Sequence, residues 1–240
     1  MNNFNPKELI DDIQAKSDGI FDPLFTTNIF FKDIFLQDHH RDSIFSYLNV
    51  KISDYIVDPL LSNYTGDVKG FASIHRLAEF DVLTSQIETA VVQYLSSLCK
   101  VIDKIQIYHQ KSWPVFLKKD TSVSVHSHSN AHISAIYYFD ISSNEGGDLV
   151  FHSPFNLGLP SNANGVEFFY PKYYLRAIKP YTGMLVVFPS ILRHEVTKYL
   201  GETPRISFSY DFTLTASPRL GSGSVEMLAP AIETWLPFKV

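Results

Sequence analysis

The sequence predicts a mainly β protein of the α+β class, built as a double-stranded β-helix, or jelly roll, with supporting N-terminal helices. From Lys104 onward, short segments rich in β-branched and aromatic residues follow one another, separated by the turn signals NEGG, SNANG, KPYTG and GETP. Roughly eight such segments at regular spacing favour a closed barrel or a jelly roll of two sheets. Before them, residues 82–100 repeat apolar side chains at steps of three and four, which predicts a helix packed outside the sheet.

The 240 residues predict one structural domain with three parts. Residues 1–103 are expected to supply a strand and helical support, and residues 104–213 the double-stranded β-helix. Within the support region, residues 21–36 fit a first strand with a turn, and residues 38–48 fit a helix. Residues 214–240 form a tail whose apolar end, LAPAIETWLPF, is expected to pack on the barrel or on a second subunit of a homodimer.

The composition narrows the class of partner and the compartment. A net charge of -5 without a basic run gives no nucleic-acid or membrane footprint. The single Cys99 excludes an internal disulfide and fits a reducing compartment. The N-terminal letters MNNFNPKELIDD are polar and acidic, unlike a signal peptide, and no apolar run reaches transmembrane length. We therefore expect a soluble, cytoplasmic protein.

The stretch SVSVHSHSNAHISAIYYFD, residues 122–140, carries the first chemical signal. Serine and valine alternate with the period of a strand, and His126 and His128 continue the parity of the serines. Two histidines at i and i+2 on a strand end can bind one metal side by side, and imidazole suits iron, zinc, copper or nickel. Surface histidines are the alternative. His132 follows in the loop, and HISAIYYFD predicts a second strand.

A second stretch, GMLVVFPSILRHEV, offers a distant third ligand. Its apolar run from Met184 to Phe188 is typical of a strand buried on both faces. The offsets of Gly183, Pro189 and His194 approach the second motif of the cupins, with Ile191 in place of the usual second glycine. We expect His194 to meet His126 and His128 across the barrel. A surface histidine beside Glu195 is the alternative.

The segment RISFSYDF alternates throughout its length. Arg205, Ser207, Ser209 and Asp211 share one face, and the apolar residues between them share the other. An arginine at the mouth of a polar lumen is costly unless it meets an anion, and its planar fork matches a carboxylate bidentately. Ser207 adds a hydroxyl on the same face. The alternatives are an ion pair between Arg205 and Asp211, or solvent.

Four motifs together, HSHSNAHISAIYYFD, GGDLVFHSP, GMLVVFPSILRHEV and RISFSYDF, resemble the small bacterial and phage group of 2-oxoglutarate- and iron(II)-dependent oxygenases. The resemblance covers residues 21–213 and is less specific upstream of the motifs. It implies a double-stranded β-helix and a metal site made by His126, His128 and His194. It implies that Arg205, helped by Ser207, binds the distal carboxylate of 2-oxoglutarate.

One departure separates the sequence from most of that superfamily, which binds iron with two histidines and a carboxylate. His128 stands where the carboxylate usually does, although the small group shares this feature. Asp120, Asp148 and Glu195 are nearby acids, but none has the expected offset.

The implied reaction uses iron(II), 2-oxoglutarate and molecular oxygen to oxidise a C–H bond, with hydroxylation of a small-molecule or peptidyl substrate as the default outcome. Trp113, Tyr137 and Tyr138 are expected to line the substrate pocket, with the core as the alternative. His132 is also expected at the substrate pocket, and it is the best substitute should one of the three metal ligands fail. Two alternatives stay open. One is a three-histidine cupin-type dioxygenase that does not use 2-oxoglutarate. The other is a non-enzymatic jelly-roll binding module.

Overall fold

The computed structural model describes residues 27–55, 73–99, 102–141, 145–154, 175–218 and 229–236. The strands are β1 (Phe30–Asp33), β2 (Ile105–Leu117), β3 (Val123–His126), β4 (Ile133–Asp140), β5 (Leu149–His152), β6 (Leu175–Ile178), β7 (Met184–Pro189), β8 (His194–Val196) and β9 (Arg205–Ala216). The helices are α2 (Asp38–Tyr55) and α3 (Asp81–Leu98), with 3-10 turns η2 (Ile74–Arg76), η3 (Ala78–Phe80), η4 (Ile102–Lys104) and η7 (Ile232–Thr234).

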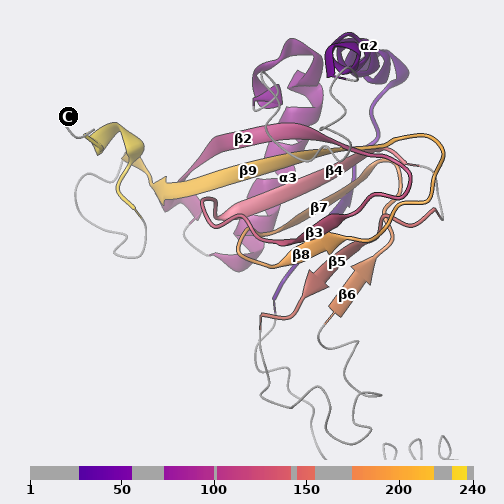
Figure 1. The fold of residues 1–240 in the computed structure, drawn as a ribbon. Coiled ribbons are helices and arrows are strands. Elements are labelled where there is room, and N and C mark those ends of the chain that lie inside the picture. Colours follow the sequence, from indigo (N-terminus) through magenta and orange to yellow (C-terminus); the bar gives the residue numbers. More distant parts are fainter. Residues whose placement is uncertain are drawn as a thin grey trace, which may run out of the picture.

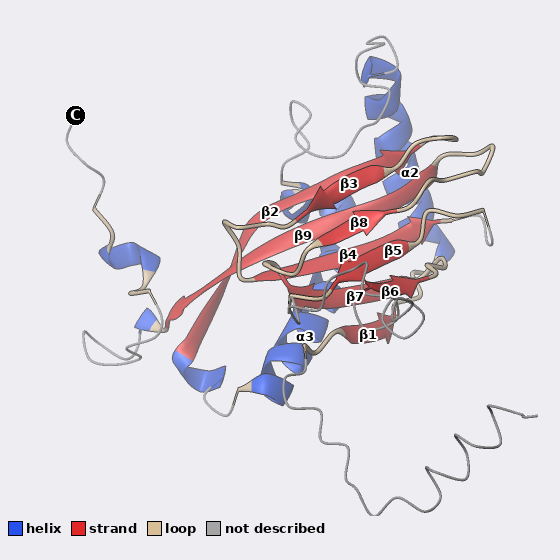
Figure 2. Cartoon of the chain, turned by 60° about the horizontal axis from the view of Figure 1, so that its bottom comes forward, coloured by secondary structure: helices blue, strands red, loops and turns tan. Residues whose placement is uncertain are grey.

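The strands form two antiparallel sheets, one of five strands in the order β1-β7-β4-β9-β2 and one of four in the order β3-β8-β5-β6. Helices α2 and α3 cover the outer face of the five-stranded sheet, and the four-stranded sheet covers its inner face (Figure 1). Seen from below, β3, β8, β5 and β6 lie in front and α3 lies behind (Figure 2). This arrangement is a jelly roll, so the predicted fold class is confirmed.

Strands β4, β7 and β9 are buried on both faces, because the helices cover one face of the five-stranded sheet and the four-stranded sheet covers the other. Successive side chains of a strand point to opposite faces, so each strand serves two cores. On β9, Phe208 and Tyr210 belong to the core under the helices. On β4 and β7, Tyr138 and Phe188 belong to the core between the sheets. Full burial of one such side chain contributes about 1.5–3 kcal/mol, so these strands anchor the fold.

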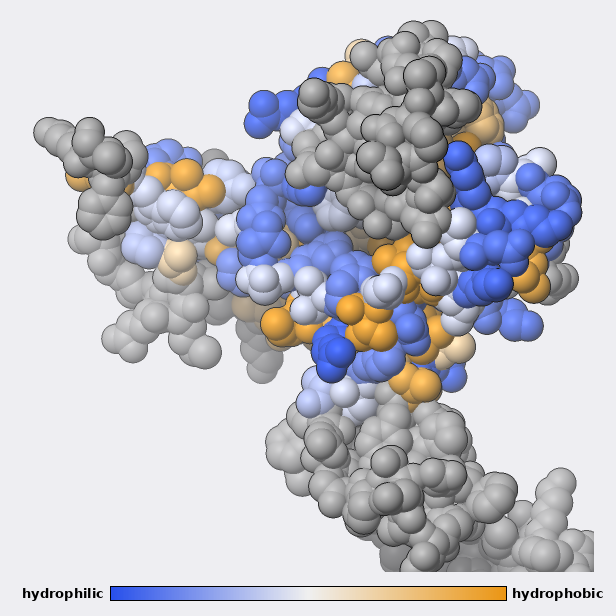
Figure 3. Space-filling view, viewed as in Figure 1, coloured by the Kyte–Doolittle hydropathy of each residue, from blue (hydrophilic) through white to orange (hydrophobic). Residues whose placement is uncertain are grey.

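Helix α3 begins and ends close to the predicted boundaries and buries the predicted stripe, which includes Leu83, Ile87, Val91 and Tyr94. Helix α2 also forms where expected, burying Ile44 and Leu48, and it extends beyond residue 48. None of the described helices is long and apolar enough to cross a membrane. On the face shown in Figure 3, the hydrophobic residues among those coloured form small groups separated by hydrophilic ones.

Strand β2 is longer than the sequence pattern indicated, because it joins the IQIYHQ segment and the Trp113 region into one element. Its register with β9 shifts between His109 and Lys111, so one residue, Gln110, is extra. Such a bulge changes which alternate residues face each side. His109 therefore lies toward the helices, against Phe212, while Trp113 lines the cavity between the sheets.

The N-terminal region around strand β1 and the C-terminal tail are described only in part. Strand β1 forms within residues 21–36 and pairs with β7, which adds a fifth strand to the sheet. In the tail, Tyr108 donates a hydrogen bond to Glu233 at 2.9 Å, but Trp235 is 52% exposed and Leu236 is 92% exposed. Residues 1–26 and 56–72 of the predicted support region, and residues 219–228 and 237–240 of the tail, lie outside the described residues, so their predicted roles stay predictions.

Candidate active site

A cavity of about 460 Å³ lies between the two sheets. Its wall combines hydroxyl and apolar side chains with imidazoles and one guanidinium. The lining residues are Trp113, Val115, Ser122, Val123, Ser124, His126, His128, Ile136, Tyr138, His194, Val196, Arg205, Ser207 and Ser209. Among the described lining residues, Arg205 is the one with a permanent charge, and the three histidines predicted to bind a metal ion line the same cavity.

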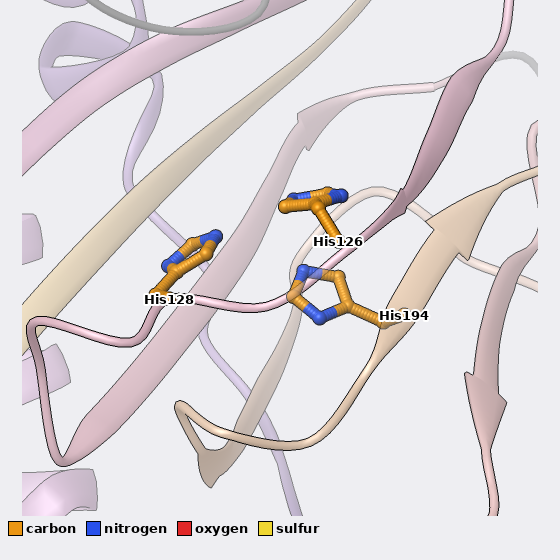
Figure 4. Close-up of side chains that lie close together, drawn as sticks. All are labelled: His126, His128 and His194. Carbon is orange, nitrogen blue, oxygen red and sulfur yellow. The ribbon is translucent and has the colours of Figure 1, made fainter.

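The histidines of the cavity come together because β3 and β8 are neighbours. His126 is the last residue of β3 and His194 is the first residue of β8, and their Cα atoms are partners in the ladder. His128 lies two residues beyond β3, where its backbone N–H donates to the Ser190 carbonyl at 2.9 Å. Each of the three can offer one nitrogen, and these atoms all lie within 4.8 Å of one another. Figure 4 shows the three rings turned toward a common point.

The hydrogen bonds of the three rings decide which nitrogens face that point. The Nδ1 atoms of His126 and His194 lie 2.8 Å and 2.9 Å from the carbonyl oxygens of Ser124 and Leu192. A carbonyl only accepts, so each Nδ1 carries the proton and donates it. The Nδ1 of His128 lies 2.7 Å from the carboxylate of Asp211 and donates in the same way. Each Nε2 is then left with a free lone pair for a metal ion.

Burial keeps two of these rings neutral. Loss of solvent, with the nearby imidazoles as a smaller cause, lowers the pKa of His194 from 6.5 to about 4. Burial also lowers the pKa of His126. An imidazole must be unprotonated to bind a metal ion. Because burial already lowers the pKa of His126 and His194, few protons have to be displaced from them near neutral pH. The set of three imidazoles fits a divalent transition metal such as iron(II).

The guanidinium of Arg205 lies in the same cavity, at the start of β9, and is 1% exposed. Its central carbon lies 4.9 Å from the centroid of the Tyr138 ring. Among the described residues, the Arg205 Nε and the Tyr138 hydroxyl are buried without a hydrogen-bond partner. Burial lowers the pKa of Arg205 and raises that of Tyr138 to about 12. Unpaired buried donors are costly, so this pair of groups fits an anionic ligand.

Gly147 makes room for the side chain of Arg205. Its φ of +70° lies in the left-handed region, which side chains rarely adopt. A Cβ there would lie 3.3 Å from both Arg205 Cδ and Tyr199 Cδ2. A glycine at position 147 therefore leaves space for the side chain of Arg205.

The other predicted pocket residues divide into two groups. Trp113 and Tyr138 line the cavity, and the rings of Trp113 and His128 have centroids 5.7 Å apart. Tyr137 lies instead under the helices, where its hydroxyl donates to the Ile34 carbonyl at 3.1 Å. Adjacent residues of a strand face opposite sides, so Tyr137 and Tyr138 could not both line the cavity.

His132 also lies away from the cavity wall. Its Nδ1 accepts a hydrogen bond from the backbone N–H of Leu214 at 3.1 Å, and its own backbone N–H donates to the Phe212 carbonyl. The ring thus pins the loop to β9, which corrects its assignment to the substrate pocket.

Among the acids singled out in the sequence, Asp120 pairs with Lys198 at 3.1 Å and Glu195 with His152 at 3.1 Å. The backbone N–H of Asp148 donates to the Thr197 hydroxyl at 2.9 Å, and burial lowers the pKa of Arg205 by more than the charge of the Asp148 carboxylate raises it. Asp211 was expected to share the Arg205 face and was considered as its ion-pair partner. Asp211 instead accepts a hydrogen bond from the ring of His128. The alternation of RISFSYDF predicted the face on which Asp211 lies but not this partner.

Comparison with known proteins adds a family to this geometry. Residues 111–211 match the family described as "Putative 2OG-Fe(II) oxygenase", where 2OG is 2-oxoglutarate. These residues, which include His126, His128, His194 and Arg205, therefore carry a 2OG-Fe(II) oxygenase domain. The domain places the protein among the oxidoreductases that use iron(II), 2-oxoglutarate and molecular oxygen, which confirms the predicted class and cofactors.

Solved structures support the fold of the 2OG-Fe(II) oxygenase domain. AviO1 from Streptomyces viridochromogenes Tue57 is 12% identical with a TM-score of 0.54, over 80% of this chain and 90% of that one. The non-heme monooxygenase ThoJ, as its nickel complex, is 11% identical with a TM-score of 0.50, over 80% and 76% of the chains. At such identities the likeness concerns the fold alone. No curated protein sequence matches the chain significantly.

Proposed function

We propose that this 2OG-Fe(II) oxygenase domain holds iron(II) on His126, His128 and His194 and hydroxylates a small-molecule or peptidyl substrate. We propose further that Arg205 binds the distal carboxylate of 2-oxoglutarate, with Ser207 and Tyr138 as hydroxyl donors. Tyr138 thereby moves from the predicted substrate pocket to the cosubstrate pocket. Trp113, beside His128, is left as the residue of the cavity wall best placed to meet the substrate.

One observation carries the proposal. Three imidazoles that can share a metal ion and a buried guanidinium line the same cavity. A metal site alone does not call for a buried arginine, because desolvating its charge is costly without an anion. A dicarboxylate held by the metal ion and by Arg205 would account for both features.

The residues of the chain have distinct tasks in the reaction. Bound iron(II) supplies the site at which oxygen and 2-oxoglutarate react, and 2-oxoglutarate is converted to succinate and carbon dioxide. Arg205 orients the cosubstrate through two parallel hydrogen bonds, which fixes its reactive end toward the histidines. An apolar part of the wall limits water around the reacting groups; it is formed by Val115, Ile136 and Val196.

The two other functions predict different behaviour of Arg205. A three-histidine dioxygenase without 2-oxoglutarate, or a binding module that holds zinc, does not need a dicarboxylate anchor. The buried Nε of Arg205 and the buried hydroxyl of Tyr138 therefore favour the 2-oxoglutarate-dependent function.

The wider setting of the protein is also proposed from its composition. A cytoplasmic location is supported by the single cysteine, which fits a reducing compartment. A homodimer that covers the exposed Trp235 and Leu236 is a further proposal, which a sedimentation measurement would test.

The activity is tested by succinate release. The protein is incubated with iron(II), 2-oxoglutarate and oxygen, alone and with a panel of amino acids, peptides and small metabolites. We expect slow succinate formation alone, faster formation with a true substrate, and none in His126→Ala. Succinate formation equal to that of a metal-free control throughout the panel would contradict the proposed function.

A further inference from the structure

Asp211 is a buried acid that the cavity wall does not include. It lies on the cavity side of β9, 3% exposed, with Ser134 of β4 as its Cα partner on one side and Lys111 of β2 on the other. Lys111 directs its Nζ over the Trp113 ring, 4.8 Å from the centroid. A buried carboxylate is costly unless hydrogen bonds compensate the loss of water, so the partners of Asp211 indicate its role.

Those partners are a candidate metal ligand and a serine. His128 Nδ1 and Ser134 Oγ each lie 2.7 Å from the same oxygen of Asp211, and both donate to it. Ser134 Oγ also lies 2.8 Å from Ser190 Oγ, and the Ser190 carbonyl accepts the backbone N–H of His128. His128 is thus held at its ring and at its backbone by one connected set of buried groups.

The charge of the site gives this contact a second meaning. Iron sites of the common type contain two histidines and one carboxylate, so a ligand itself brings negative charge. Here the third position is His128, and three neutral imidazoles bring none. Asp211 lies against the ring nitrogen remote from the metal position. A carboxylate in this place fixes the tautomer and orientation of a ligand histidine and makes its other nitrogen more basic.

We infer that Asp211 is a positioning residue that orients His128 for metal binding and supplies, through the imidazole, the negative charge that a carboxylate ligand would supply. The inference rests on the proposed function, because it requires a metal ion on the three histidines. It extends that function by adding a residue that does not touch the metal.

The chain contains a matched control for this contact. Glu195 follows His194 directly and pairs with the ring of His152 at 3.1 Å. Glu195 is not among the residues that line the cavity, and His152 is not among the three clustered histidines. Neutralising Glu195 therefore removes a carboxylate–histidine contact near the site without touching a ligand.

The test is calorimetric titration of iron(II), with oxygen excluded, into the wild type, Asp211→Asn, Asp211→Ala and Glu195→Gln. Asp211→Asn retains an acceptor oxygen and the side-chain shape, so it is expected to fold. Loss of a group that supports a ligand histidine costs about 10- to 100-fold in metal affinity. We expect that loss in Asp211→Ala, a smaller loss in Asp211→Asn, and wild-type affinity in Glu195→Gln.

The outcomes separate the two proposals. Iron(II) binding by the wild type with equal affinity in Asp211→Asn would overturn the inference and leave the proposed function standing. No iron(II) binding by the wild type would overturn the proposed function, and the inference with it. A lower unfolding free energy of metal-free Asp211→Asn, with unchanged metal affinity, would show a purely structural role and also overturn the inference.

Discussion

The two faces of strand β9 are equally buried but chemically opposite. On β9, the face toward α2 and α3 presents Ile206, Phe208, Tyr210 and Phe212, while the face toward the cavity presents Arg205, Ser207, Ser209 and Asp211. All eight are 8% exposed or less. Burial of apolar groups is favourable, whereas burial of polar groups is costly unless they are paired. One face of β9 therefore specifies the fold, and the other is retained for chemistry.

The largest effect on the free energy of unfolding is expected from substitution on the apolar face of β9, with a neighbouring residue on the polar face as the reference. Phe208 packs against the rings of Phe80 and Phe139, each with its centroid 5.1 Å away. Phe208→Ala should lower the free energy of unfolding by about 3–5 kcal/mol, because it leaves a cavity under the helices. Ser209→Ala should change it by only about 1 kcal/mol or less, because it removes a single hydroxyl and leaves almost no cavity. Urea denaturation measures both, and equal losses would contradict the division of the two faces.

On the helix side of the sheet, His75 should make the stability of the fold depend on pH. The ring of His75 stacks on that of His109 and lies 2.7 Å from the Ser112 hydroxyl. Burial, followed by the proximity of His109, lowers the pKa of His75 from 6.5 to about 4. Between these values the unfolded chain binds the proton more strongly than the folded one, so stability falls as the pH falls.

This destabilisation should be smaller in His75→Gln. With allowance for solvent screening at a partly exposed ring, the loss of unfolding free energy between pH 7 and pH 4 should shrink by about 1–2 kcal/mol. Urea denaturation of metal-free protein at several pH values measures it. The same slope in the wild type and in His75→Gln would show that another group is responsible.

The smallest effect is expected from a single hydroxyl on the cavity face. Tyr138→Phe removes a buried hydroxyl that has no hydrogen-bond partner among the described residues. The unfolding free energy of the metal-free protein should stay the same or rise, because an unpaired buried group is lost. Affinity for 2-oxoglutarate should fall by about three- to tenfold, since a hydrogen bond contributes roughly 1 kcal/mol. Unchanged affinity would remove Tyr138 from the cosubstrate pocket.

Much of the fold could be predicted from the sequence because the signals were local. The alternation of RISFSYDF and the apolar run of GMLVVFP correspond to β9 and β7, and the spacing of residues 82–100 corresponds to α3. The cluster of His126, His128 and His194 also followed from motif offsets. Roles within the site, including metal binding and the anchoring of 2-oxoglutarate, stay predictions.

Other features depend on contacts between distant parts of the chain. Strand β8 has only three residues, too few for a periodic pattern, and is defined by its neighbours β3 and β5. The bulge near Gln110 is visible only in the register of β2 against β9. Asp211 and His128 are 83 residues apart, and alternation gives a face but no partner. By contrast, the separation of Tyr137 from Tyr138 follows from strand geometry alone.

The central claim is that the cavity binds a metal ion and a dicarboxylate together, and Arg205 tests it most directly. With oxygen excluded, 2-oxoglutarate is titrated calorimetrically into iron(II)-loaded wild type, Arg205→Ala and Arg205→Lys. Arg205→Ala should bind 2-oxoglutarate at least about tenfold more weakly, since about 1.4 kcal/mol corresponds to one decade. Arg205→Lys should recover part of the loss, because an ammonium cannot pair bidentately, and iron(II) affinity should be unchanged in both variants. Equal 2-oxoglutarate affinity in all three proteins, or no binding to the wild type, would contradict the claim.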